Sequence, residues 1–184
     1  MIITLSGLPG AGKSTVKSIL AEKLGLKEYS MGDLRGTMAL KRGMNIEQFN
    51  ALSMTDPSID TSVDEFQTYL GETEDDFIID SLLSWHFIPK SFKVFFTIEP
   101  RVAAERIFNA RATETGRDDE PAYKTIEQAQ EIIGKRMEQN DARYKKWYGF
   151  SFQDPKNFDL VLDTTHLTPT EVADAIIKVL PTKA

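Results

Sequence analysis

Hydrophobic residues follow two different periods along the chain, and the two alternate. Five short apolar or β-prone runs predict strands, at residues 2–6, 27–30, 77–80, 92–98 and 158–162. Most of these runs are continuous, which is typical of parallel strands buried on both faces, and we expect this burial for the last three. Between the runs, apolar residues recur at helical spacing. Strands alternating with helices predict an α/β fold, a three-layer, doubly wound parallel sheet of about five strands.

Start and stop signals delimit the expected helices. They cover residues 13–24, 33–42, 100–112 and 125–148, with a final helix that begins at Thr168. Proline at the first helical turn favours two of these starts, at Pro100 and Pro169. Residues 45–75 are polar and acidic with helical apolar stripes, and Asn45 and Gln48 are spaced as a helix cap. This segment predicts a small, loosely cored helical insertion.

Composition limits the classes of function. The 184 residues carry 22 Lys and Arg against 28 Asp and Glu, a formal charge of -6. This length fits one domain, residues 1–184, and the acidic balance argues against a nucleic-acid polymer or an anionic membrane as the main partner. No cysteine occurs, and His86 and His166 stand far apart, so thiolate and two-histidine metal sites are not expected. With no signal-peptide pattern and no long apolar run, we expect a cytoplasmic protein.

A glycine-rich segment lies between the first expected strand and the first expected helix. It reads Gly7, Leu8, Pro9, Gly10, Ala11, Gly12, Lys13 and Ser14, followed by Thr15. The spacing matches the phosphate-binding loop G-x-x-x-x-G-K-[ST] in the structural context that this motif requires. Backbone N–H groups and the helix N-terminus would surround phosphates. Lys13 would contact the β and γ phosphates of ATP, and the Ser14 hydroxyl would ligate Mg²⁺.

Further polar residues follow the second and third expected strands. Because ligands of doubly wound sheets collect outside the strand carboxyl ends, Ser30 and Arg35 are expected at the same site. The Arg35 guanidinium would grip a second phosphate. Asp80 ends its strand and would hold the magnesium shell near Ser14, directly or through water. A solvated helix arginine and a turn-capping aspartate are the structural alternatives.

Arginines are frequent around residues 113–122, which have the composition of a mobile loop. They are Arg101, Arg106, Arg111, Arg117, Arg136 and Arg143. Several arginines under a closing lid would neutralise the charge that develops in phosphoryl transfer. Arg106 and Arg111 differ by about 140° around a helix, so both reach one phosphate only if that helix ends near Ala110. Arg136 and Arg143 are two turns apart and share one face.

Taken together, these motifs resemble those of nucleoside monophosphate kinases, and most closely the short cytidylate kinases. The resemblance covers nearly the whole chain. It is carried by the phosphate loop at 7–15, Leu24-Gly25-Leu26, Tyr29-Ser30-Met31-Gly32 with Arg35, Ala104-Glu105-Arg106-Ile107, residues 143–149 and residues 158–165.

The resemblance implies two mobile parts and a set of residue roles. A monophosphate-binding helical insertion would span about 36–75, and an arginine-bearing lid about 106–122. The acceptor would be bound by Ser30, Arg35, Asp80, Arg136 and Arg143. ATP would be bound by the phosphate loop with Arg106, Arg111 and the turn at Thr164-Thr165. Lys13, Arg106, Arg111 and Arg136 would stabilise transfer, with Mg²⁺ held by Ser14 and Asp80.

One position departs from the family pattern. Where these cytidylate kinases carry an arginine two residues after the strand-tip acid, this chain has Leu82. The leading hypothesis is an Mg-ATP-dependent kinase, with a monomer favoured, that phosphorylates CMP or dCMP to the diphosphate. Because leucine cannot bind a phosphate, two alternatives stay open. One is a kinase for another nucleotide or small metabolite, and the other is a weakly catalytic nucleotide-binding regulatory protein.

Overall fold

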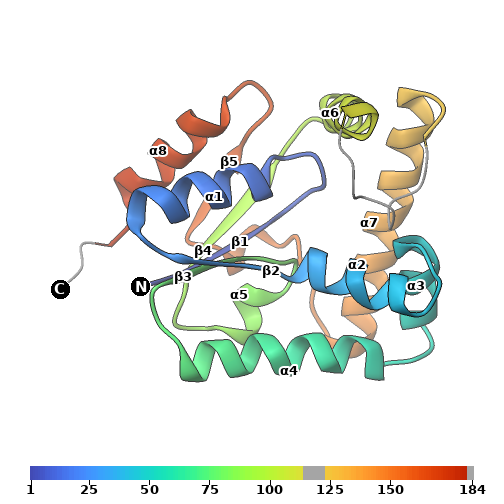
Figure 1. The fold of residues 1–184 in the computed structure, drawn as a ribbon, viewed down its shortest axis with the longest axis horizontal. Helices are drawn as coiled ribbons and strands as arrows, with labels where there is room; N and C mark the ends of the chain where they lie inside the picture. The colour runs from blue at the N-terminus through green and yellow to red at the C-terminus, as the bar shows by residue number, and fades with distance from the viewer. Residues whose placement is uncertain (114–122, 182–184) are drawn as a thin grey trace.

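The computed structural model describes residues 1–113 and 123–181. Its centre is a parallel sheet of five strands in the order β2-β3-β1-β4-β5 (Figure 1). The strands are β1 Ile2–Gly7, β2 Lys27–Ser30, β3 Phe77–Asp80, β4 Phe92–Thr97 and β5 Leu160–Asp163. The predicted doubly wound fold is therefore confirmed, and each strand begins within two residues of its expected start.

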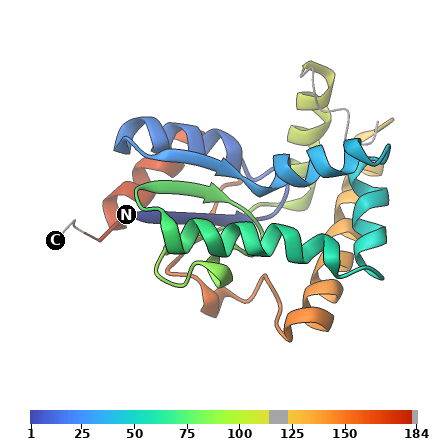
Figure 2. The ribbon, with the colours of Figure 1, turned by 60° about the horizontal axis from the view of Figure 1, so that its bottom comes forward.

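Helices cover both faces of this sheet. They are α1 Lys13–Leu24, α2 Met31–Lys41, α3 Ile46–Ser53, α4 Ser58–Thr73, α5 Ser84–Phe87, α6 Pro100–Thr113, α7 Ile126–Tyr148 and α8 Pro169–Val179, with a 3-10 turn at Pro155–Asn157. Figure 2 shows the sheet between α1 on one face and α4 on the other. Helix α7 stands beyond the carboxyl ends of the strands, next to α2 and α3 (Figure 1). The short helix α5 was not predicted, because four residues are too few to show a period.

The core explains why the inner strands have continuous apolar sequences. On β1, Ile3 and Leu5 pack in a cluster with residues of α1 and α8. Ile2 points to the opposite face and packs in a second cluster with residues of α4. Because successive side chains of a strand point to opposite faces, a strand covered by helices on both sides is buried at every position. The two buried polar side chains of β1, Thr4 and Ser6, are hydrogen-bonded.

The fifth strand corrects one expectation. We predicted residues 158–162 to form a strand buried on both faces, but β5 lies at the edge of the sheet and begins at Leu160. Its residues alternate between partly buried and exposed, and Val161 is 42% exposed. An edge strand has only one neighbour, so its outer side chains lose the cover that the inner strands have.

Three helices form the segment between β2 and β3. Asn45 and Gln48 make the predicted cap at the start of α3, in the form of a complete capping box, and this helix ends at Ser53. The segment has an apolar cluster of its own, with Ala39, Ile46, Phe49 and Ile59 at its centre. This cluster is separate from the core of the sheet, but α4 also packs on the sheet through Val63 and Leu70, and the helical insertion stays a prediction.

Gly7 has a conformation that only glycine supplies here. Its φ is +138°, and a Cβ at this position would lie 2.4 Å from the backbone oxygen of Phe96.

We expect Gly7→Ala to lower the free energy of unfolding by roughly 2 to 4 kcal/mol, because a strained φ and a backbone clash act together. Gly134→Ala in α7 is the matched control, since nothing lies within 4 Å of that Cβ. It should stabilise the helix by about 1 kcal/mol. Urea unfolding of both variants measures these changes, and equal midpoints for Gly7→Ala and the wild type would contradict the prediction.

Candidate active site

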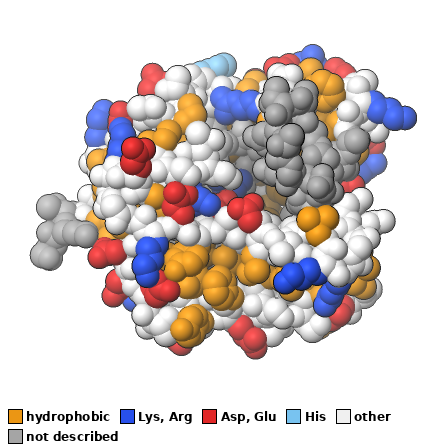
Figure 3. Space-filling model, viewed as in Figure 1, with side chains coloured by type: hydrophobic (Ala, Val, Ile, Leu, Met, Phe, Trp, Pro, Cys, Tyr) orange, Lys and Arg blue, Asp and Glu red, His pale blue; other side chains and the backbone are white. Residues whose placement is uncertain are grey.

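A cavity of about 750 Å³ opens at the carboxyl ends of the strands. The phosphate loop and the start of α1 form one wall, and residues of α2, α4 and α7 form the opposite wall. Figure 3 shows the surface hollowed near the centre of the view, with Lys and Arg side chains beside the hollow. Every site residue predicted from the sequence lines this cavity except Leu8, Thr165 and Arg111. The side chain of Arg111 lies outside the described residues.

The phosphate loop connects β1 to α1 as predicted. Gly12 adopts a left-handed conformation, and α1 begins at the next residue, Lys13. The Lys13 ammonium donates to the backbone oxygens of Gly7 and Leu8, at 2.9 Å each. Burial lowers the pKa of Lys13 to about 8, and the nearby Asp80 carboxylate opposes this shift. The loop therefore holds a cation that gives up part of its charge near pH 8 and would regain it beside a phosphate.

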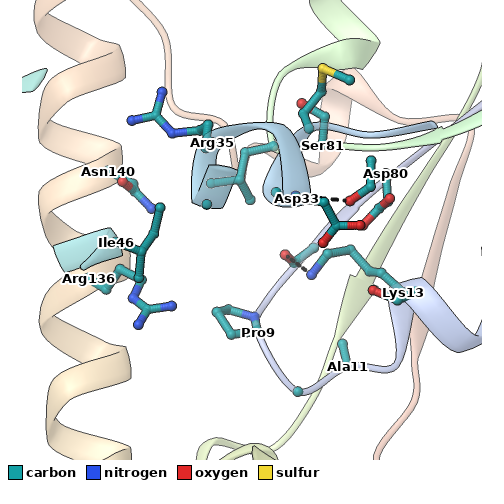
Figure 4. A pocket seen from close by; sticks show the side chains of 18 of the residues that line it. Pro9, Ala11, Lys13, Asp33, Arg35, Ile46, Asp80, Ser81, Arg136 and Asn140 are labelled. Atoms are coloured by element: carbon teal, nitrogen blue, oxygen red, sulfur yellow. Dashed lines mark hydrogen bonds between the residues drawn. The ribbon is translucent and has the colours of Figure 1, made fainter. Parts of the chain in front are cut away.

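Asp80 ends β3 and points towards Lys13, as Figure 4 shows. One of its carboxylate oxygens, Oδ1, accepts a hydrogen bond from Lys17 Nζ at 2.9 Å, and both side chains are almost fully buried. Sequence reasoning missed Lys17. The available signal was its spacing of one helical turn from Lys13, which places both lysines on one face of α1.

Ser14 and Asp80 supply the donor types that Mg²⁺ prefers. Both line the cavity, and in the described part of the chain no group of three or more His, Cys, Asp and Glu side chains could hold a metal. Mg²⁺ is commonly bound through one or two carboxylates, with the remaining positions filled by substrate phosphates and water. The Ser14 hydroxyl and the second carboxylate oxygen of Asp80, which does not accept the Lys17 hydrogen bond, fit that type of site.

Arg35 and Arg143 meet at one buried carboxylate. Arg35 Nη1 lies 2.5 Å from Asp60 Oδ1, and Arg143 Nε lies 3.0 Å from Asp60 Oδ2, although this second contact lacks hydrogen-bond geometry. Arg35 also donates to the side chains of Asn50 and Ser53. Arg35, Arg143 and Asp60 together, two guanidinium groups and one carboxylate, form a cluster with a net positive charge. The predicted arginines are thus together, and the shared Asp60 was missed.

Arg136 and Arg143 line the cavity from the same face of α7, as their spacing predicted. Arg136 Nη2 lies 3.5 Å from the Tyr123 hydroxyl and 3.6 Å from Glu47 Oε1. Asn140 lies between the two arginines and is 4% exposed, and its amide oxygen has no hydrogen-bond partner in the described residues. Figure 4 shows Arg136 and Asn140 on this helix and Arg35 opposite them.

Arg106 of α6 joins the phosphate loop to the end of the sheet. Its Nη2 donates to the backbone oxygens of Thr164 and Thr165, at 3.0 and 3.1 Å. The Thr164 hydroxyl donates to the Ala11 oxygen of the loop at 3.1 Å. The predicted ATP-side residues Arg106 and Thr164 therefore lie next to the loop.

Helix α6 ends within one residue of its predicted end at residue 112. It continues to Thr113, so the condition that it end near Ala110 is not met. Positions 106 and 111 therefore differ by about 140° around the helix. Of the predicted lid at 106–122, residues 114–122 lie outside the described part of the chain.

Ser30 and Leu82 lie at the tips of neighbouring strands. Ser30 caps α2, and its hydroxyl oxygen accepts the backbone N–H of Asp33 at 3.3 Å. Asp33 also lines the cavity and points towards Asp80 and Lys13 (Figure 4), and we had not predicted it. Leu82 lines the cavity as well, and its backbone oxygen accepts from the Ser6 hydroxyl and the Trp85 indole. An apolar side chain thus stands where the family pattern has an arginine.

A parallel sheet with a glycine-rich phosphate loop and a facing wall of arginines defines a P-loop phosphotransferase. A family model described as an AAA domain matches residues 3–134. The chain is 34% identical over 182 residues to a cytidylate kinase of Methanocella arvoryzae, a match that covers 98% of this chain and 97% of that one. It therefore belongs to the cytidylate kinase family of P-loop kinases.

Two further similarities come from a longer protein and from a solved structure. An S-adenosylmethionine-dependent nucleotide dehydratase of Lacinutrix mariniflava is 33% identical over 177 residues, covering 96% of this chain but 35% of that protein. The shikimate kinase of Bacteroides thetaiotaomicron superposes with a TM-score of 0.67 at 13% identity, covering 97% of each chain. At this low identity the structural similarity concerns the fold alone.

The Lys17–Asp80 pair predicts a large stability change. We expect Lys17→Met to lower the free energy of unfolding by roughly 3 to 5 kcal/mol, because the substitution leaves a buried carboxylate without its cation. Lys23→Met on the same helix is the control, since its pair with Asp174 is exposed to solvent. That change should stay below about 1 kcal/mol. Thermal and urea unfolding of both variants check the prediction, and similar losses in the two would show that the buried pair is not special.

The lowered pKa of Lys13 predicts that phosphate binding takes up protons. At pH 8 the group is about half protonated, so a bound polyphosphate should draw up to about half a proton onto it. Isothermal titration calorimetry with ATP, in two buffers of different ionisation enthalpy, measures this uptake. At pH 6.5 Lys13 is already charged and this contribution should vanish. Equal uptake at the two pH values would contradict the assignment.

Proposed function

We propose that this protein transfers the γ-phosphoryl group of ATP to CMP or dCMP and forms the nucleoside diphosphate. The observation that carries the proposal is a single cavity with a phosphate loop on one side and paired arginines on the other. Such a cavity suits two phosphorylated ligands whose phosphates meet in the middle. The cytidylate kinases to which the chain is similar supply the choice of acceptor.

ATP is proposed to bind along the phosphate loop. Its β and γ phosphates would contact the loop N–H groups and Lys13, and the adenine would lie towards the turn at Thr164-Thr165, which Arg106 fastens to the loop. Magnesium would be held by Ser14 and Asp80, and it supplies positive charge between the phosphate groups. Lys17 would keep the Asp80 carboxylate in place.

The acceptor phosphate is proposed to bind at the arginine wall. Arg35 and Arg143 are already fixed through Asp60, so little side-chain freedom remains to be lost on binding. Arg136 stands two turns from Arg143 and is the third arginine of this wall. Preorganised donors of this kind stabilise the charge that develops during transfer without having to rearrange.

The reaction is proposed as a direct in-line transfer. An oxygen of the acceptor phosphate forms a bond to the γ phosphorus of ATP, while the bond from that phosphorus to the bridging oxygen breaks and ADP leaves with the electron pair. No covalent intermediate with the enzyme is needed. Closure of the proposed insertion at 36–75 and of the lid at 106–122 would keep out water, which otherwise hydrolyses ATP.

Leu82 keeps a second candidate function open. Because this side chain lines the cavity where an arginine is expected, the acceptor phosphate has one cation fewer in that position. A kinase for a different nucleotide or small metabolite would be one result of this change, and a weakly catalytic regulatory protein another. Lys17 does not replace the missing cation directly, since it lies behind Asp80 and is not part of the cavity wall.

The proposed setting is the cytoplasm, with small nucleotides as partners and a monomer as the working unit. Among residues 1–113 and 123–181, no helix is both long and apolar enough to span a bilayer.

An acceptor panel tests the proposed function. We expect ADP formation from Mg-ATP to be stimulated most by CMP or dCMP, compared with UMP, AMP, GMP, dTMP and no acceptor. Lys13→Ala is the blank and should lose at least about a hundredfold in turnover, because it removes a cation at the transferred group. A clear preference for a non-pyrimidine acceptor would favour the metabolite alternative. ATP binding without stimulation by any acceptor would favour the regulatory one.

A further inference from the structure

Two further polar side chains of α4 line the cavity and have no part in the proposed phosphate chemistry. They are Gln67, which is 1% exposed, and Asp64, which is partly buried and stands about one turn earlier. Helix α4 covers the face of the sheet opposite α1 (Figure 2). The pair is thus separate from the phosphate loop but open to the same cavity. Burying an amide and a carboxylate is costly unless each has defined partners, so their partners show what the pair can bind.

The orientation of the Gln67 amide is fixed by its neighbours. Its Oε1 accepts hydrogen bonds from the hydroxyls of Ser81 and Ser84, at 2.7 and 2.6 Å. Its Nε2 donates to Asp64 Oδ1 at 3.3 Å. Because an ionised carboxylate can only accept, the nitrogen must be the atom that faces Asp64. An amide nitrogen carries two hydrogens, and within the described residues one of them remains available as a donor.

The Asp64 carboxylate is fixed in the same way. The Tyr148 hydroxyl donates to Asp64 Oδ2, so Oδ1 is the oxygen beside Gln67. Burial raises the pKa of Asp64 to about 6, with Asp60 adding to the shift and Tyr148, Arg35 and Arg143 opposing it. Asp64 is therefore ionised above pH 7 and acts as an acceptor. Burial also raises the pKa of Tyr148, which keeps its hydroxyl as a donor.

A fixed donor next to a fixed acceptor can distinguish flat heterocycles by their edges. Val63 and Leu82 also line the cavity, so it offers apolar side chains as well as the polar pair. The edge of cytosine presents an amino donor beside a ring-nitrogen acceptor. Uracil and thymine present a carbonyl oxygen and an N–H at the same two positions. Among the pyrimidines, only the cytosine edge matches the pair atom by atom when the base enters in one orientation.

We propose that Asp64 and Gln67 read the base of the acceptor nucleotide. The amino group of cytosine donates to Asp64 Oδ1, and its ring N3 accepts from Gln67 Nε2. Uracil in this orientation sets a carbonyl oxygen against the carboxylate and an N–H against an N–H. Tyr148, Ser81 and Ser84 are positioning residues that hold the reading pair. The inference rests on the proposed function and names the residues that would decide its pyrimidine specificity.

Adenine has the same order of amino donor and ring acceptor as cytosine. The pair therefore selects between the two pyrimidine types, and rejection of adenine depends on the size of the cavity. For this reason the decisive comparison is CMP with UMP, two acceptors of nearly equal size. Sites that hydrogen-bond a polar group of the substrate reject analogues with the wrong group strongly, because buried partners are left unpaired.

Asp64→Asn tests the proposal. The variant keeps the shape of the side chain but can turn an N–H₂ group towards the carbonyl oxygen of uracil. We expect the ratio of kcat/KM for CMP to that for UMP to fall by about a hundredfold, with the KM for ATP unchanged. Glu65→Gln is the matched control. It makes the same charge change at the next position of α4, is exposed and does not line this cavity, and should leave the ratio as in the wild type.

Tyr148→Phe gives a second, independent test. It removes the hydroxyl that holds Asp64 without altering the carboxylate, so the CMP to UMP ratio should fall by a smaller factor, about three- to tenfold. Circular dichroism and thermal unfolding confirm that each variant is folded. If Asp64→Asn does not fold, the shift in melting temperature caused by CMP against UMP in Tyr148→Phe decides the question.

The possible outcomes separate this inference from the proposed function. Equal losses for CMP and UMP in Asp64→Asn, or an unchanged ratio in both variants, would overturn base reading by this pair. A wild-type protein that phosphorylates no nucleotide would overturn the proposed function. In that case the melting shifts of the wild type and Asp64→Asn with CMP and UMP still test the reading of the base.

Discussion

The acceptor side of this molecule depends on one buried carboxylate. Asp60 is 4% exposed and lies against two guanidinium groups, from Arg35 on α2 and Arg143 on α7. These residues come from three segments that are far apart in the sequence. Because an unpaired buried charge is strongly destabilising, the three helices can approach only in an arrangement that keeps both pairs. That arrangement fixes the wall opposite the phosphate loop, and with it the shape of the cavity.

The loop side depends on a different constraint, the tight parallel register at the end of β1. Gly7 pairs with Phe96 of β4, and the backbone there leaves no room for a Cβ. The chain can therefore turn directly from the strand into the loop. This turn places the Lys13 ammonium beside the backbone oxygens of Gly7 and Leu8. Asp80 ends the neighbouring strand on the other side, where Lys17 holds it. Loop, lysines and carboxylate are close because three strands end at the same edge.

A third set of contacts holds the polar side chains that we propose to read the base of the acceptor. Gln67 connects the strand tip, through Ser81, to Asp64, and Asp64 connects to Tyr148 of α7. This chain of hydrogen bonds runs parallel to the Asp60 contacts and joins the same two helices, α4 and α7. A single helix pair thus positions both the proposed phosphate grip and the proposed base reader, which explains why α4 carries buried polar residues on its inner face.

Much of this was determined by the sequence, because the signals are local. Apolar continuity predicted the inner strands, the spacing of glycines and Lys13 predicted the loop, and the seven-residue spacing of Arg136 and Arg143 predicted their common face. Only the tertiary structure decided which charges meet. No local sequence motif marks Asp60, Lys17 or Gln67 as a site residue. Their partners lie on other helices and strands or at a strand end. The position of β5 at the edge of the sheet was likewise decided by the order of strands. An edge strand and a central strand differ only in the number of neighbouring strands, which the local sequence does not specify. Burial and ion pairing are properties of contacts, and contacts between distant segments exist only once the chain has folded.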